Sequence, residues 1–129
     1  MKQLPAISEA EWEVMKALWA NEPLTAAEVI EQVAERMNWN PKTVRTLLNR
    51  LVVKEVVGIE QGSRPYAYHS LVSEETCQRE QTHTFLKRIY NGAFKPLMVN
   101  FLQSESLSEK EIDELKQLLD EQKRSGGSR

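Results

Sequence analysis

The chain of 129 residues has the length of one domain, or of two very small ones, which excludes a large multidomain enzyme. With 40% hydrophobic and 28% charged residues, and only 5 Gly and 5 Pro, it can build a core and is not of low complexity. Its 17 basic and 19 acidic residues give a net charge of −2, which argues against a protein that binds polyanions over its whole surface.

The single cysteine, Cys77, excludes an internal disulfide and a zinc site built from several thiolates. No apolar run approaches the roughly 20 residues that a membrane helix needs. The first residues, Met1–Pro5, lack the apolar stretch of a signal peptide. We therefore expect a cytoplasmic protein without direct membrane insertion.

Three segments begin with the same helix-start pattern, a hydroxyl residue followed three positions later by a glutamate. In this capping box the hydroxyl oxygen and the glutamate each accept a hydrogen bond from a backbone amide of the first turn. The pattern predicts helices that begin after Ser8, Thr25 and Ser108. The predicted core positions are Trp12, Met15 and Trp19 in the first helix, and Val29, Ile30, Val33, Ala34 and Met37 in the second.

Another helix is predicted from Asn40, a good cap, with Pro41 at the first helical position. At 100° per residue, one arc is apolar, namely Val44, Leu47, Leu48 and Leu51. The opposite face has no acidic residue and carries Lys42, Thr46, Asn49 and Val53, with Arg45 and Arg50 on its flanks.

Basic charge is concentrated around this helix. Residues 36–70 hold 6 basic and 2 acidic residues, whereas residues 1–35 hold 2 basic and 7 acidic ones. A solvated helix face would account for a basic cluster on its own. Surface helices usually mix both signs, however, so a face without acids indicates a match to phosphates and base edges.

Beyond Lys54 the pattern changes to that of β-strands. Two β-rich runs, 56–60 and 65–69, flank a glycine-containing loop and predict a hairpin. Pro65 cannot donate a ladder hydrogen bond and therefore belongs at the loop end. This places Arg64 near an exposed tip.

The remaining third of the chain predicts three short helices with broad apolar stripes, which begin near Ser73, near Phe94 and after Ser108. Three such helices cannot bury these stripes against one another, so we expect a homodimer in which the same surface of a second copy covers them. The expected dimer-interface residues are Phe85, Ile89, Phe94, Leu97, Met98, Phe101, Ile112, Leu115 and Leu119.

We therefore expect a mainly α fold with a small β hairpin (α+β), divided into three parts. Residues 1–71 form a winged helix-turn-helix domain, residues 72–124 a short all-α dimerisation domain, and residues 125–129 a flexible tail.

Residue patterns typical of enzymes are missing. His69 and His83 lie in different predicted elements, and the sequence has no nucleophile elbow, phosphate loop or carboxylate pair. We expect no catalysis and no cofactor. Cys77, Glu80 and His83 share one helical face, but a buried thiol beside a surface Glu and His explains them better than a metal site does.

The order helix, helix, basic helix, hairpin over residues 8–70 is that of a winged helix-turn-helix, whose third helix enters the major groove of DNA. Small helical domains with hairpins also mediate protein contacts, but the basic face favours double-stranded DNA. The side chains suited to base edges are Thr43, Thr46 and Asn49; those suited to phosphates or guanine are Lys42, Arg45 and Arg50, with Arg64 on the wing.

Four segments resemble the penicillinase-repressor (BlaI/MecI/CopY) family, in order and over nearly the whole chain from about Pro5 to Gln122. They are Ile7–Met15, Trp39–Thr46 together with Leu51, Tyr66–Tyr68 and Phe85–Gly92. The paired Cys-x-Cys motifs of the copper-responsive branch are absent. The resemblance is therefore to the BlaI/MecI-like branch.

This resemblance implies a dimeric transcriptional repressor that binds inverted-repeat operators with TACA-type half-sites, in front of β-lactamase or penicillin-binding-protein genes. It also implies a membrane-bound zinc protease receptor that senses β-lactam and cuts the repressor at an Asn–Phe bond, here Asn100–Phe101. The resemblance further implies that Lys42, Thr43 and Thr46 contact DNA. The alternative is a metal-responsive or otherwise orphan winged-helix regulator of an unrelated operon.

Overall fold

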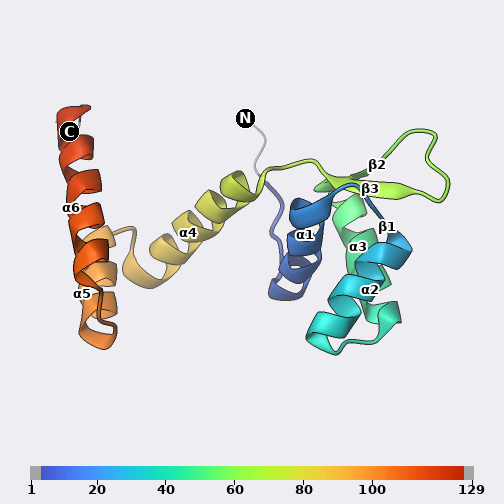
Figure 1. The fold of residues 1–129 in the computed structure, drawn as a ribbon, viewed down its shortest axis with the longest axis horizontal. Helices are drawn as coiled ribbons and strands as arrows, with labels where there is room; N and C mark the ends of the chain where they lie inside the picture. The colour runs from blue at the N-terminus through green and yellow to red at the C-terminus, as the bar shows by residue number, and fades with distance from the viewer. Residues whose placement is uncertain (1–3, 127–129) are drawn as a thin grey trace. The chain divides into compact units, whose positions relative to one another are not determined.

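The computed structural model describes residues 4–126, which form two compact units, the first up to Gln81 and the second from Thr82. The fold is mainly helical with one small sheet, which confirms the predicted class (Figure 1). In chain order the elements are α1 (Glu9–Asn21), β1 (Leu24–Thr25), α2 (Ala26–Met37), α3 (Pro41–Val53), β2 (Val57–Ile59), β3 (Ala67–Ser70), α4 (Glu74–Tyr90), α5 (Phe94–Ser104) and α6 (Glu109–Arg124).

All three predicted capping boxes form. The Ser8, Thr25 and Ser108 side chains accept from the backbone amides of the glutamates three positions later, at 3.1, 3.2 and 3.1 Å. Each glutamate accepts in return from the cap residue's own amide, at 2.9, 2.8 and 3.0 Å. These reciprocal bonds satisfy amides that a helix start leaves without partners, so α1, α2 and α6 begin where the sequence predicts.

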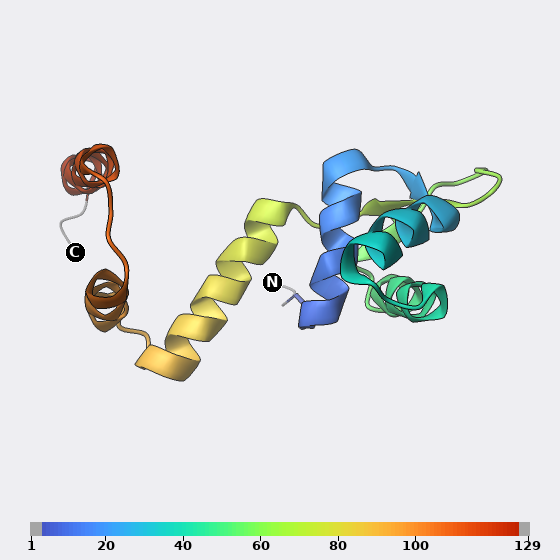
Figure 2. The same cartoon turned by 60° about the horizontal axis from the view of Figure 1, so that its bottom comes forward.

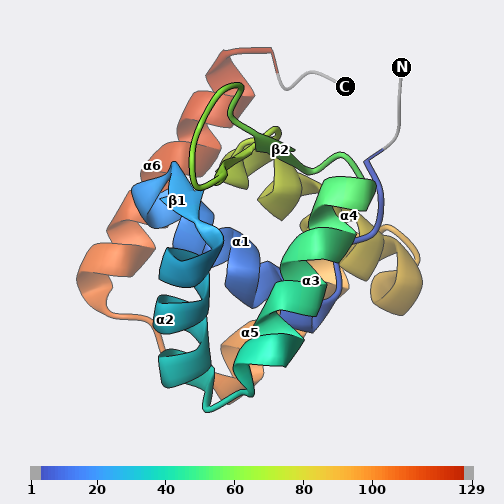
Figure 3. The ribbon, with the colours of Figure 1, turned by 90° about the vertical axis from the view of Figure 1, so that its right-hand side faces the viewer.

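The core of the first unit lies between α1, α2, α3 and the sheet. Figure 3 shows α2 and α3 meeting at the turn of residues 38–40, with α1 behind them. Of the three predicted core residues of α1, Met15 is fully buried and Trp19 is partly buried and packs against the core, whereas Trp12 is partly buried and lies outside it. The apolar core comprises Val14, Met15, Ala17, Leu18, Leu24, Val29, Val33, Val44, Leu47, Leu48, Leu51, Val56, Val57 and Tyr68.

The sheet is antiparallel with strand order β1-β3-β2. Strands β2 and β3 form the predicted hairpin, with Val57 opposite Ser70 and Ile59 opposite Tyr68. Strand β1 pairs with the other edge of β3 through Leu24 and Thr25 and was not predicted. The loop between β2 and β3 projects from the sheet as the wing (Figures 1 and 2).

An ion pair with a buried carboxylate joins the start of α1 to the end of α3. Glu11 is 2% exposed, and its Oε1 accepts from the Nζ of Lys54 at 2.6 Å. Lys54 Nζ also donates to the backbone oxygen of Ala6 at 2.8 Å. Burial raises the pKa of the Glu11 carboxyl, but the hydrogen bonds from Lys54 and Ser8 lower it by more, so the pKa lies below its usual range.

Because the folded-state pKa of Glu11 is depressed, its contribution to stability is present above the ordinary glutamate pKa of about 4.3 and is lost as the pH falls through the folded value. We expect Glu11→Gln to lower the free energy of unfolding by about 1–3 kcal/mol at neutral pH and to flatten its decline in acid. Denaturant titrations across pH measure both effects. Equal curves for Glu11→Gln and the exposed control Glu31→Gln would contradict this role.

The beginning of α4 is fixed to α1. The indole Nε1 of Trp19 donates to the backbone oxygen of Val72 at 3.0 Å, and the Trp19 ring lies edge-to-face with Trp12 at a centroid distance of 5.2 Å. Cys77 on α4 is 2% exposed. The first compact unit therefore extends into α4, which is one continuous helix (Figure 2), whereas the sequence places the boundary before it, after residue 71.

The second unit has large exposed apolar surfaces. Neither α5 nor α6 contains a buried residue. Helix α4 ends at Tyr90, followed by Asn91 and Gly92 with positive φ, and the Gly92 amide donates to the oxygen of Leu86 at 3.0 Å. In the part of the chain that the structure describes, no helix has both the length and the apolarity to cross a membrane.

Candidate nucleic-acid interface

Helix α3 is positioned by its first turn. The Asn40 side-chain oxygen accepts from the amide of Lys42 at 2.8 Å, and Pro41 occupies the first helical position, as predicted. The preceding helix ends at Asn38 in the left-handed conformation, with φ of 57°. This cap reverses the chain between α2 and α3 within three residues and so sets the direction of α3.

One face of α3 is anchored in the core and the other is exposed. Val44, Leu48 and Leu51 are 0% exposed and Leu47 is 5% exposed. All six residues of α3 that the sequence assigns to DNA lie on the exposed face: Lys42, Thr43, Arg45, Thr46, Asn49 and Arg50. The helix itself contains no acidic residue. The exposed face therefore offers cations, hydroxyl groups and an amide, which are the groups that contact phosphates and base edges.

The Thr46 hydroxyl already donates one hydrogen bond, to the backbone oxygen of Lys42 at 3.0 Å. Its proton is therefore committed within the helix. The oxygen can still accept a hydrogen bond, and the residue, which also carries a methyl group, is exposed. Both suit a base edge that offers an amino group or the thymine methyl.

A small cavity of about 280 Å³ brings three further elements to the side of α3. It is lined by Arg45 of α3, by Thr25–Ala27 at the start of α2, and by Pro65, Tyr66 and Tyr68 from the wing and β3. The first amides of a helix and a nearby guanidinium both attract phosphate. Sequence reasoning missed Thr25–Ala27 and Tyr66, although the capping box at Thr25 already marked the start of α2.

The wing carries Arg64 on an exposed loop, as predicted. The loop is held by its own polar groups, because the Ser63 hydroxyl donates to the Glu60 oxygen and accepts from the Ala67 amide, each at 2.9 Å. The Glu60 amide also donates to the Ala67 oxygen at 2.8 Å. Arg64 thus projects from a loop whose base is fixed.

In the second unit the predicted interface residues are exposed or partly exposed. Phe94, Ile89 and Leu119 are 58%, 53% and 65% exposed. A groove of about 720 Å³ runs along α5 and α6. Its apolar lining includes Phe94, Met98, Leu102, Ile112, Leu115 and Leu119, five of which belong to the predicted interface.

The Asn100–Phe101 bond lies inside α5. The Asn100 side-chain amide donates to the Tyr90 hydroxyl at 3.1 Å, and Phe101 is 44% exposed. Tyr90 in turn lies edge-to-face with Phe85 at 6.0 Å. The bond thus belongs to a helix that is tied to the end of α4.

Comparison with known proteins identifies the family. The penicillinase repressor family model matches residues 7–121. The penicillinase repressor of Bacillus licheniformis is 38% identical over 95% of this chain and 96% of its own length. The methicillin resistance regulatory protein MecI of Mammaliicoccus sciuri is 37% identical over 88% of this chain and 92% of its own length.

The chain belongs to the penicillinase repressor family. It is therefore a DNA-binding transcriptional repressor and not an enzyme. Among solved structures, the DNA-binding domain of the repressor BlaI is similar, with a TM-score of 0.51 and 36% identity over 57% of this chain and 90% of that domain. The Bacillus licheniformis BlaI monomer in complex with the blaP half-operator gives the same TM-score and identity over 58% of this chain and 92% of that one.

The surroundings of Cys77 bear on the metal-responsive alternative. Within residues 4–126, no group of three His, Cys, Asp or Glu side chains is placed to hold a metal ion. Burial, together with the charge of Glu80, raises the pKa of the Cys77 thiol. A thiolate is the form that binds metals, so this environment disfavours Cys77 as a ligand.

Proposed function

We propose that this repressor binds inverted-repeat operator DNA as a homodimer and represses β-lactam resistance genes, either β-lactamase or penicillin-binding-protein genes. The observation that carries the proposal is the exposed, acid-free basic face of α3 beside the wing, on the fold of a repressor family. The names of the relatives, penicillinase repressor and methicillin resistance regulatory protein, support the choice of genes.

In the proposed complex, α3 enters the major groove with its exposed face toward the bases. Thr43, Thr46 and Asn49 read base edges, because each offers short polar groups on the outward face. Lys42, Arg45 and Arg50 bind phosphates or guanine, and Arg64 binds a phosphate or the minor groove. The structure of BlaI with a half-operator supports this arrangement, since that domain is 36% identical to this chain.

We place the dimer contact in the second unit. Its helices carry apolar side chains that a single copy leaves exposed, and the groove along α5 and α6 is lined mainly by them. A second copy offers the same surface, so a two-fold arrangement removes both from water. Each winged-helix unit, called the reading head below, binds DNA weakly on its own. When two are joined in a dimer, binding of the first to one half-site makes binding of the second to the other half-site intramolecular.

We further propose that cleavage at Asn100–Phe101, by a membrane-bound zinc protease receptor, ends repression. The cut leaves Phe94 and Met98 on one fragment and α6 on the other, so it divides the apolar groove. It leaves α3 and the wing intact. Loss of repression then follows from loss of the dimer, not from damage to the reading head.

We expect a substitution on α3 to reduce sequence discrimination and a substitution on the wing to reduce DNA affinity in general. Thr46→Ala removes an acceptor and a methyl group from the base-reading face, so we expect discrimination between operator and random DNA to fall by roughly 1–3 kcal/mol. Arg64→Ala removes a phosphate contact, so both duplexes are bound more weakly and the salt dependence falls. Titrations with both duplexes at several salt concentrations measure this difference.

Thr82→Ala, which removes the hydroxyl of an exposed residue outside the proposed DNA contacts, serves as the matched control and should change neither quantity. Should Thr46→Ala weaken operator and random DNA equally, Thr46 does not read bases. The proposed function as a whole fails if the chain shows no preference for any inverted-repeat duplex.

A further inference from the structure

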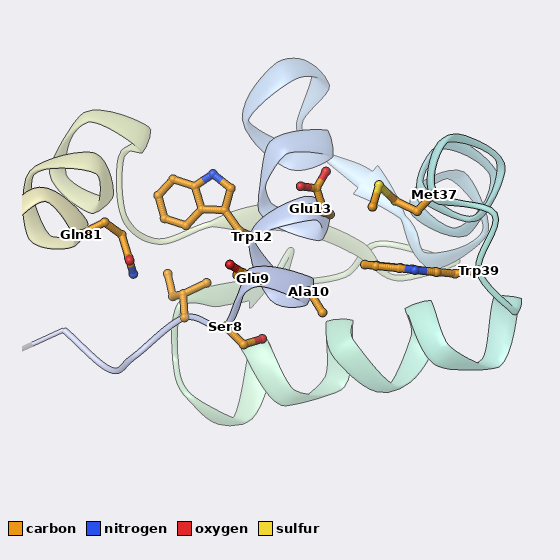
Figure 4. A pocket seen from close by; sticks show the side chains of 9 residues that line it. Ser8, Glu9, Ala10, Trp12, Glu13, Met37, Trp39 and Gln81 are labelled. Carbon is orange, nitrogen blue, oxygen red and sulfur yellow. The ribbon is translucent and has the colours of Figure 1, made fainter. Parts of the chain in front are cut away.

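A pocket of about 640 Å³ lies over the start of α1 in the first unit, and none of the proposed DNA contacts lines it. Its volume falls within the range of about 300–1,000 Å³ that is typical of small-molecule sites. In Figure 4, Trp12 lies on the same side of α1 as Gln81 of α4, whereas Met37 and Trp39 lie on the other side. Glu9 lies between these two walls.

One of the two carboxylates that line the pocket has no cationic partner among residues 4–126. Two carboxylates line it, those of Glu9 and Glu13. Glu13 is already paired with Arg36 at 3.0 Å and with Lys16 at 3.4 Å. Glu9 has neither an ion pair nor a side-chain hydrogen bond to any of residues 4–126. Glu9 is therefore the pocket carboxylate that a bound cation can pair with.

An aromatic ring lies beside this charge. Glu9 and Trp12 are three residues apart on α1 and so are neighbours on the helix surface. Figure 4 shows the Trp12 indole nearly face-on, and this residue is only partly buried. The face of an indole attracts cations, and a carboxylate next to it adds a direct charge attraction. Together they favour a cationic group.

The opposite wall is apolar. Ala10 lies on the surface of α1, and the side chains of Met37 and Trp39 close the far side (Figure 4). Methionine adapts to irregular shapes and makes favourable contacts with aromatic rings. This wall ends next to Asn40, the cap of α3, so an occupant would touch the turn that sets the direction of α3.

We propose that this pocket binds a small organic cation with one positive charge and one aromatic group. The ammonium group lies between Glu9 and Trp12, and the aromatic group lies over Ala10 toward Met37 and Trp39. The site shares no residue with the proposed operator contacts.

The test uses the full chain without DNA and benzyltrimethylammonium as the probe, with benzenesulfonate as the anion of similar size. We expect saturable shifts of the indole N–H resonances of Trp12 and Trp39 with the cation and none with the anion. Absence of saturable shifts at millimolar concentrations of the cation overturns the proposal, as does equal binding of both probes.

Two variants test the charge and the volume separately. Glu9→Gln should weaken binding of the cation about threefold, whereas Glu31→Gln, which removes an exposed charge outside the pocket, should leave it unchanged. Ala10→Met fills the pocket and should abolish binding, with circular dichroism confirming that the variant is folded. If both Glu9→Gln and Ala10→Met bind benzyltrimethylammonium as tightly as the unsubstituted chain, the proposed site is wrong. Since no DNA is present, such a failure leaves the proposed operator binding untouched.

Discussion

A chain that ends at Asn100 is expected to sediment as a monomer and to bind inverted-repeat DNA about 10²–10⁴ times more weakly than the full chain. The truncation removes α6 and the end of α5, and with them one side of the apolar groove. It leaves the core of the first unit and α3 in place. The affinity for a single half-site should therefore be preserved while the gain from tethering is lost.

A chain that ends at Arg124 is the matched control, because it keeps all six helices. Analytical ultracentrifugation and titration of labelled duplexes should show this control to be dimeric and tightly bound. If the chain that ends at Asn100 is still a dimer, the dimer contact does not lie in α6 or the end of α5. If that chain is a monomer and still binds the operator as tightly as the full chain, tight binding does not depend on dimerisation.

Leu48→Ala is expected to cost about 2–5 kcal/mol of unfolding free energy. Leu48 is 0% exposed and packs in the core on the anchored face of α3, between the turns that hold Val44 and Leu51. Removing its side chain leaves a cavity under the helix that carries the proposed DNA contacts. We therefore expect a lower denaturation midpoint. Under conditions in which a fraction of the molecules is unfolded, we also expect weaker apparent operator binding, because only folded molecules bind.

Val53→Ala on the same helix is the control, because Val53 is 82% exposed. Its effect on stability should stay within about 0.5 kcal/mol, as is usual for surface substitutions. Denaturant titrations followed by circular dichroism compare the two. A cost for Leu48→Ala no larger than for Val53→Ala would show that α3 is not anchored through this face.

The helices could be predicted because their determinants are local. Capping boxes, Pro41 after Asn40 and an apolar arc at helical spacing all act within a few residues, so they specify α1, α2, α3 and α6 without knowledge of the fold. The same holds for the exposed face of α3. Once the apolar arc is buried, the polar residues between its members must face outward.

Features that join distant segments could not be predicted. Strand β1 has two residues and exists only because β3 lies beside it. The Glu11–Lys54 pair links positions 43 residues apart, and the Trp19–Val72 hydrogen bond links positions 53 apart. The cavity that joins Arg45 to the start of α2 and to the wing also depends on three separate elements.

The apolar faces of the second unit were predicted correctly, because they follow from helical spacing within each segment. The exposed side chains of α5 and α6 show that a surface remains to be covered. Which molecule covers it depends on the shape and symmetry of the assembly. A second copy is therefore a proposal that solution measurements must test.

The most direct test of whether the repressor binds two half-sites as a dimer is sedimentation of the full chain with each of two duplexes. One duplex carries two inverted TACA-type half-sites, and the other has one of them scrambled. We predict two chains on the intact duplex and an affinity at least about 100-fold above that for the scrambled one. A single chain bound to either duplex with equal affinity would contradict the account.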